Sequence, residues 1–140
     1  MIDLKTTPYA AFLLRVASGL LFLAHGLLKV FVFTIPGTVG FFESLGLPAV
    51  FAYATILAEI GGGLLLIVGV YTRAVALALV PVLLGATWAH AGNGWVFSNT
   101  GGGWEFPLYW ASVQLAIAAI GPGVYAVKLP ELRPRRAATA

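Results

Sequence analysis

Long apolar runs alternate along the chain with short connections that are polar or rich in glycine and proline. A helix of about twenty apolar residues is long enough to cross the hydrocarbon core of a bilayer. The runs predict four such helices, at about residues 9–33, 49–71, 74–90 and 105–127. The pattern is therefore typical of an integral membrane protein with four spanning helices.

The first connection, residues 35–48, has a pattern of its own. A Pro-Gly pair opens it and Gly-Leu-Pro closes it, and both are signals that break helices. Between them, Phe41, Phe42 and Leu45 have helical spacing around Glu43, which predicts a short amphipathic helix at the membrane interface. The predicted fold class is all-α: a four-helix membrane bundle with a short interfacial helix between helices one and two.

The first predicted helix carries a polar stripe. Its members recur at spacings of three and four, which places them on one helix face. They are Arg15, Ser18, Phe22, His25 and Lys29. Ionisable groups inside a membrane cost at least a few kcal/mol each and usually face a bundle interior or a wet cavity. The other helices must therefore satisfy this face, and Gly19 and Gly26 beside it let another backbone come close.

Glu59, near the centre of the second helix, is the natural counter-charge for that stripe. It can neutralise Arg15, His25, or both through water. We predict a buried Arg15–Glu59 ion pair. One interpretation is that this pair only holds two helices together, since buried pairs often serve specificity. The other is a polar pocket that binds a ligand or moves protons.

Further polar residues are predicted at the outer mouth of this pocket. His90 ends the third helix and Glu105 begins the fourth, on the same side of the membrane as Lys29. The candidate pocket therefore comprises His25, Lys29, Glu59, His90 and Glu105. We expect a cavity between helices one and two that opens toward the extracytoplasmic half.

The composition agrees with a membrane location and narrows the chemistry. The 140 residues are 60% hydrophobic and 9% charged, with mean hydropathy +0.95, whereas soluble domains have about 25% charged residues. There is no cysteine, which excludes a thiol–disulfide relay, cysteine-ligated zinc and iron–sulfur clusters within this chain. His25 and His90 differ in depth and follow no ligand spacing, so neither metal nor haem is predicted.

Charge distribution predicts the orientation. The basic residues outside the helices are Lys5, Arg73, Lys128, Arg133, Arg135 and Arg136. The positive-inside rule places these residues on the cytoplasmic side of the membrane. All of them can lie there only if the chain has four helices and both termini are cytoplasmic. Residues 128–140 are expected to form a basic, disordered cytoplasmic tail. The basic residues are scattered or terminal, so no nucleic-acid partner is predicted.

These residues resemble a known family, DoxX. The first-helix pattern comprises Arg15, Gly19, Phe22, His25, Gly26 and Lys29, and Gly46-Leu47-Pro48 resembles the connector of the family. The second-helix pattern comprises Glu59, Gly62, Gly63, Gly69, Thr72 and Arg73. The similarity by motif covers roughly residues 9–80.

The resemblance implies a multi-pass protein of a bacterial or archaeal inner membrane that is linked to redox work there. Family members include the quinone-reducing thiosulfate oxidoreductase and complexes that guard against oxidative or quinone stress. A quinone is thus the expected cofactor, and a membrane or extracytoplasmic redox protein is the expected partner. Association with further copies of the same chain is also compatible with the sequence.

Three functions are compatible with these observations. The first is a quinone-associated subunit of a membrane oxidoreductase, which would be at most the membrane part of an enzyme. The second is a non-catalytic scaffold that stabilises a partner complex. The third is a small transporter or proton path, for which four short helices leave little room.

Overall fold

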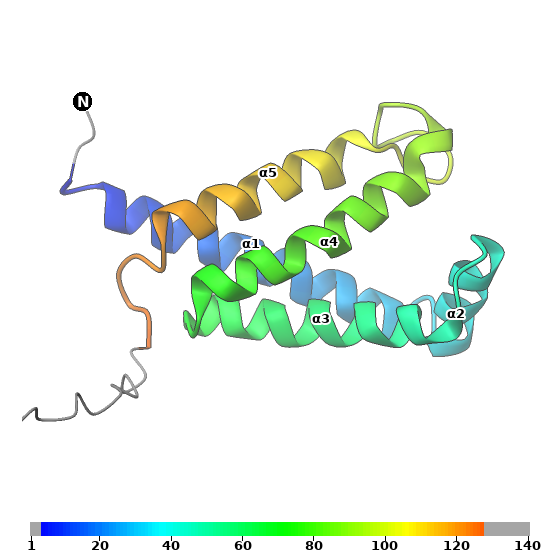
Figure 1. The fold of residues 1–140 in the computed structure, drawn as a ribbon, viewed down its shortest axis with the longest axis horizontal. Coiled ribbons are helices and arrows are strands. Elements are labelled where there is room, and N and C mark those ends of the chain that lie inside the picture. The colour runs from blue at the N-terminus through cyan, green and yellow to red at the C-terminus, as the bar shows by residue number, and fades with distance from the viewer. Residues whose placement is uncertain (1–3, 128–140) are drawn as a thin grey trace, which may run out of the picture.

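A computed structural model describes residues 4–127 of the chain. Its helices are α1 (Thr7–Phe31), α2 (Ile35–Ser44), α3 (Ala49–Val68), α4 (Thr72–His90), the short 3₁₀ helix η1 (Ala91–Asn93) and α5 (Glu105–Ile120). Within the described residues there is no strand, and the all-α prediction is confirmed. Figure 1 shows α1, α3, α4 and α5 packed side by side, with α2 across one end.

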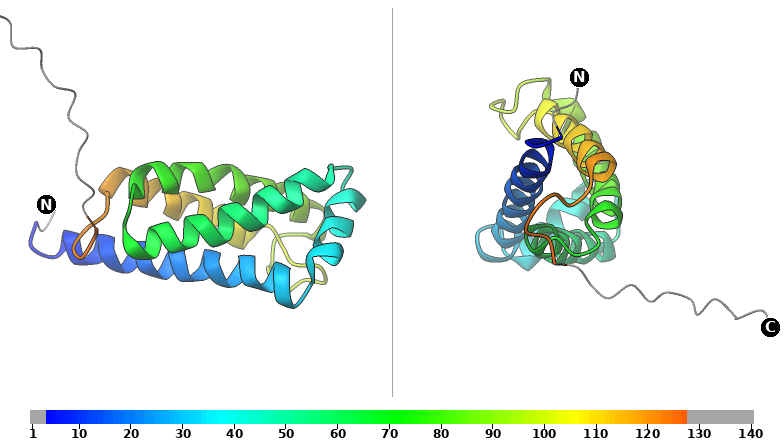
Figure 2. Two further views of the ribbon diagram at one scale, coloured as in Figure 1. Left: turned by 90° about the horizontal axis from the view of Figure 1, so that it is seen from below. Right: turned by 90° about the vertical axis from the view of Figure 1, so that its left-hand side faces the viewer.

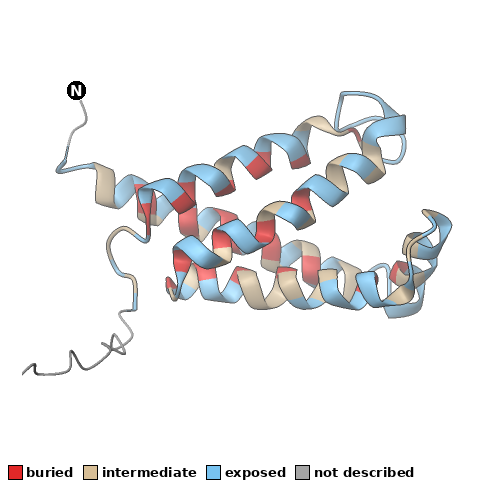
Figure 3. Ribbon diagram, viewed as in Figure 1, coloured by how far each residue is buried: buried red, intermediate tan, exposed pale blue. Residues whose placement is uncertain are grey.

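Among residues 4–127, three helices are long and apolar enough to cross a membrane: α1, α3 and the continuous stretch Thr72–Asn93. The apolar helix α5 is shorter, with 16 residues. The molecule is therefore a multi-pass membrane protein whose environment is a lipid bilayer. Its outward-facing positions are largely exposed apolar side chains, while buried positions face the bundle interior (Figure 3).

Two predicted helix ends differ from the structure by three residues or more, and the other ends agree within two residues. The second helix ends at Val68 instead of residue 71, because Gly69 has a φ of 85° and closes it in the left-handed region. The fourth helix ends at Ile120 instead of residue 127, because Gly121 has a φ of 98° and Pro122 follows it. The predicted tail, residues 128–140, lies outside the described residues.

The four long helices form two antiparallel pairs, α1 with α3 and α4 with α5 (Figures 1 and 2). One end of the bundle carries α2 and the loop of residues 91–104; we call it the α2 end. The other carries the start of α1, the α3–α4 connection and residues 121–127; we call it the Arg73 end. The described chain thus begins and finishes at the same end.

Glycines set the distance between α1 and α3. A Cβ atom on Gly19 would lie 2.7 Å from the carbonyl oxygen of Gly63, and one on Gly26 would lie 2.6 Å from Cγ1 of Ile60. Real Cβ atoms do not approach neighbours so closely, so only glycine fits. Small residues permit this backbone contact in membranes, where packing replaces the hydrophobic effect as the driving force.

The short helix α2 was predicted, and the structure confirms that it is helical. It begins after Thr34, whose φ is 64° and whose Oγ1 accepts a hydrogen bond from the amide of Gly37. Thr38 of α2 is buried and donates its hydroxyl to the carbonyl oxygen of Lys29, 3.0 Å away. This contact fixes α2 against the end of α1.

We expect Gly19→Ala to destabilise the protein by about 1–3 kcal/mol, because the added methyl group overpacks the α1–α3 contact. The matched control is Gly61→Ala, since a Cβ at Gly61 of α3 meets nothing within 4 Å. Thermal unfolding in detergent would measure both. Equal melting temperatures for the two variants would contradict the glycine contact.

We also expect a reporter fused after Ala140 to be cytoplasmic and a tag within residues 93–103 to be extracytoplasmic. The reason is the positive-inside rule applied to a bundle whose described ends lie together. Protease protection in spheroplasts measures this directly. A tag at Met1 and one at Ala140 on opposite sides would refute the topology.

Candidate functional site

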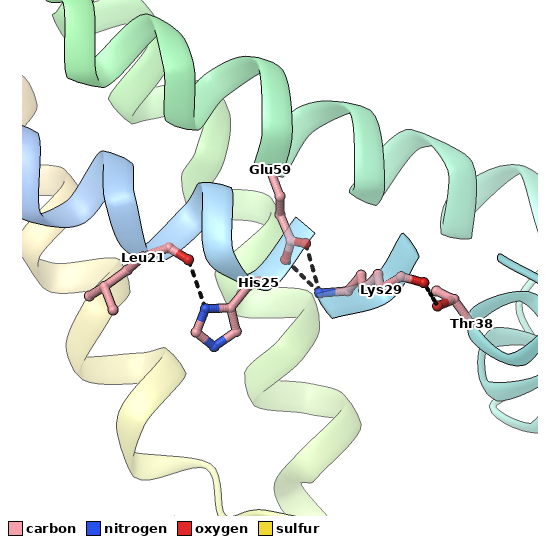
Figure 4. Close-up of polar contacts among 5 residues, drawn as sticks. All are labelled: Leu21, His25, Lys29, Thr38 and Glu59. Carbon is pink, nitrogen blue, oxygen red and sulfur yellow. Dashed lines mark hydrogen bonds and ion pairs between the residues drawn. The ribbon is translucent and has the colours of Figure 1, made fainter. Parts of the chain in front are cut away.

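The charge pair at the centre of the site joins α1 to α3. Nζ of Lys29 donates to both carboxylate oxygens of Glu59, at 2.8 and 2.7 Å (Figure 4). The side chain of Glu59 is only 8% exposed and that of Lys29 is 19% exposed. The ion pair is therefore largely shielded by the bundle. Removing either residue would leave the other charge without its counter-charge.

The predicted pairing of Arg15 with Glu59 is wrong, because the structure keeps these two residues apart. Arg15 is completely buried and donates to backbone carbonyl oxygens: Leu66 at 2.5 Å, Ile67 at 2.6 Å, Pro122 at 2.9 Å and Val124 at 3.4 Å. These are the last turn of α3 and the segment after α5. Helix ends carry unpaired carbonyls and negative dipole charge, so they stabilise a cation without a carboxylate.

The register of α1 against α3 explains the exchange of partners. Gly26 faces Ile60 and Gly19 faces Gly63, so Glu59 lies opposite the turn of α1 that approaches Lys29. Arg15 precedes Gly26 by eleven residues, which is roughly 16 Å along the helix axis. Its side chain reaches the end of α3 instead of the middle.

His25 lies next to the ion pair and faces α5. Its Nδ1 is 2.8 Å from the carbonyl oxygen of Leu21, so this nitrogen carries the hydrogen and donates it (Figure 4). The ring packs against two aromatic side chains of α5, with centroid distances of 6.3 Å to Phe106 and 5.2 Å to Trp110. Nε2 has no hydrogen-bond partner among the described residues, which leaves it available to a ligand.

A second polar group lies deeper in the bundle. Both Trp110, through Nε1 at 2.7 Å, and Gln114, through Nε2, donate to Oγ of Ser18. Gln114 is completely buried, and its Oε1 has no partner in the described part of the chain. Sequence reasoning missed this residue. The available signal was a lone glutamine inside an apolar membrane helix.

Two predicted pocket residues lie elsewhere. Glu105 accepts a hydrogen bond from the amide of Phe97, 3.0 Å away, and so holds the loop of residues 91–104. His90 ends α4 beside that loop, close to Gly102, and its Nδ1 is buried without a partner in the described residues. Neither side chain hydrogen-bonds to the Lys29–Glu59 pair in residues 4–127. The structure thus brings together His25, Lys29 and Glu59, and leaves His90 and Glu105 under the loop.

The expected opening between helices one and two is absent at the level of Gly26, where α1 and α3 remain in contact. Figure 1 shows α4 and α5 rising away from α3 toward the α2 end. An apolar groove of about 680 Å³ lies along α4 and α5 and reaches the loop. Phe106 lines this groove and also neighbours His25. The histidine is therefore one aromatic ring away from a surface that faces lipid.

Fold and site together define a small polytopic membrane protein with a buried ionic cluster in a helical bundle. Residues 10–92 match the model of the DoxX family, and the chain belongs to this family. The match includes Arg15, His25, Lys29 and Glu59 but not α5, which supplies Trp110 and Gln114.

The chain is also similar to a protein of Bacillus subtilis (strain 168) named "Putative oxidoreductase CatD". The two are 39% identical over 82 residues, which cover 59% of this chain and 60% of the relative. This chain therefore spans less than two thirds of that protein. No solved structure matches the present chain.

We expect Glu59→Ala to lower the free energy of unfolding by roughly 3–5 kcal/mol, because the partly buried Lys29 is left unpaired. Glu43→Ala is the control, since Glu43 is exposed on α2. Chemical unfolding in detergent, followed by circular dichroism, measures both. The double variant Lys29→Met/Glu59→Leu should recover much of the loss, because it removes both charges. Equal stability of Glu59→Ala and Glu43→Ala would contradict the pair's role.

Proposed function

We propose that this protein is the membrane subunit of a quinone-linked oxidoreductase and that His25, Lys29 and Glu59 form the site for the quinone headgroup. The observation that carries the proposal is the free Nε2 of His25. The His25 ring that carries this nitrogen packs against the rings of Phe106 and Trp110 and lies next to the Lys29–Glu59 ion pair. An ionisable cluster in such a position is a candidate functional site by its energetic cost alone.

The residues present fit a quinone. A quinone headgroup is flat and has two carbonyl oxygens that accept hydrogen bonds, and the rings of Phe106 and Trp110 offer flat faces next to His25. Its isoprenoid tail is apolar, and the groove beside Phe106 is almost entirely apolar and faces lipid. These features support the fit of headgroup and tail to neighbouring surfaces.

A bound quinone supplies the redox chemistry by accepting two electrons and two protons. The protein's part in this proposal is to position the headgroup and to move protons. With Nδ1–H held by the carbonyl of Leu21, neutral His25 presents Nε2 as an acceptor, and protonated His25 presents it as a donor. Electrons would come from a partner redox protein.

The name of the Bacillus subtilis relative supports the redox class, because that protein is described as an oxidoreductase. It does not specify a quinone, which is supported by the resemblance to the DoxX family and by the residues of the site. The scaffold alternative has one observation in its favour: Arg15 and the Lys29–Glu59 pair are fully satisfied within the chain. His25 is the residue on which the two functions differ.

We expect His25→Leu to weaken binding of a short-chain quinone analogue at least tenfold, since the free Nε2 is lost. The variant should still assemble, because the Nδ1 hydrogen bond that it also loses lies within one turn of α1. The control is His90→Leu, because His90 lies outside the cluster. Quenching of tryptophan fluorescence by the analogue in detergent measures binding. Unchanged affinity in His25→Leu would favour the scaffold function, especially if the protein co-purifies with a partner and no ligand.

A further inference from the structure

The Arg73 end of the bundle contains a cavity that the proposed function does not use. It has a volume of about 1080 Å³ and lies between the start of α1, the α3–α4 connection and residues 122–127. Tyr9 and Tyr71 line it, and both are exposed. Tyrosine at the end of a membrane helix is typical of the headgroup level of a bilayer. The cavity therefore lies where lipid headgroups are found.

The start of α4 offers hydrogen-bond donors to this cavity. The helix begins at Thr72 after Tyr71, which has a φ of 47° and provides no side-chain cap. The first amide with a backbone acceptor is that of Val75, which donates to Tyr71. The amides of Thr72, Arg73 and Ala74 have no acceptor among the described residues, and all three residues line the cavity. Free amides and the helix dipole favour an anion at such a terminus.

Thr72 supplies an independent observation. Its side chain is 97% buried, as its 3% exposure shows, and its hydroxyl oxygen has no hydrogen-bond partner in the described part of the chain. Most buried hydroxyl groups are paired, so an unpaired one beside a cavity indicates a missing partner. A hydroxyl that donates to an anion satisfies this group.

The charges at this end have the right sign for an anion. Arg73 is exposed at the cavity, and its guanidinium donates to the carbonyl oxygens of Ala118 and Ala119 at the end of α5, at 2.6 and 2.8 Å. It remains a cation there, because a guanidinium group is not deprotonated in proteins. The described carboxylates lie elsewhere: Glu43 and Glu105 at the α2 end, and Glu59 half-way along α3.

We propose that this cavity binds a phosphate group, with the headgroup of an anionic phospholipid as its source. The free amides at the start of α4 and the Thr72 hydroxyl donate to the phosphate oxygens, and Arg73 supplies the positive field. The tyrosine pair brackets the headgroup at the interface. This site is independent of the His25 cluster, which lies in the other half of α1.

Native mass spectrometry of the full-length protein in detergent tests this site with phosphatidylglycerol and with diacylglycerol of the same acyl chains. We expect the protein to retain phosphatidylglycerol and not the phosphate-free lipid. Thr72→Val should weaken retention about tenfold, because one hydrogen bond to a charged group is lost. The matched control is Thr87→Val in the same helix, whose hydroxyl is already bonded to Leu83.

Competition with inorganic phosphate identifies the source of the group. Displacement of phosphatidylglycerol by millimolar phosphate, with the same dependence on Thr72, would show that the site recognises phosphate from either source. Retention that phosphate does not displace would assign the site to the lipid. Equal retention by wild-type and Thr72→Val protein, or equal retention of the two lipids, would overturn the proposal.

Discussion

The fully buried guanidinium of Arg15 is the constraint on which the rest of the bundle depends. A cation in this position needs several acceptors, and the carbonyls of Leu66 and Ile67, with those of the segment after α5, provide them. These acceptors belong to two different parts of the chain. The arginine therefore joins the end of α3 to residues 122–124, and it leaves Glu59 free for another partner.

The choice of partners for Arg15 determines which residues pair in the candidate site. Because backbone carbonyls accept the hydrogen bonds of Arg15, the carboxylate of Glu59 can pair with Lys29. His25, next to that pair, keeps a ring nitrogen without a partner among the described residues. A bundle in which Arg15 took Glu59 would leave Lys29 unpaired near the end of α1. In the observed arrangement Arg15, Lys29 and Glu59 each have a partner. The titratable residues His25, Lys29 and Glu59 gather in the α2 half of the bundle.

Helix α5 also contributes residues to the candidate site between α1 and α3. Phe106 and Trp110 contact His25, and Trp110 and Gln114 donate to Ser18 of α1. Polar groups thus follow one face of α1 through the bundle, with aromatic rings between them. The opposite end carries Arg73 and the start of α4, so the two ends of the molecule differ in the charged residues they carry.

The sequence by itself determined the helices, their approximate limits and the polar face of α1, because bilayer thickness and helical periodicity depend only on residue order. It also indicated that His25, Lys29 and Glu59 belong together. Only the tertiary structure decided which cation Glu59 binds, since that follows from the register of α1 on α3, which Gly26 and Ile60 fix. Backbone carbonyls leave no mark in a sequence, so the true partners of Arg15 were hidden until helix ends and turns had been placed in space.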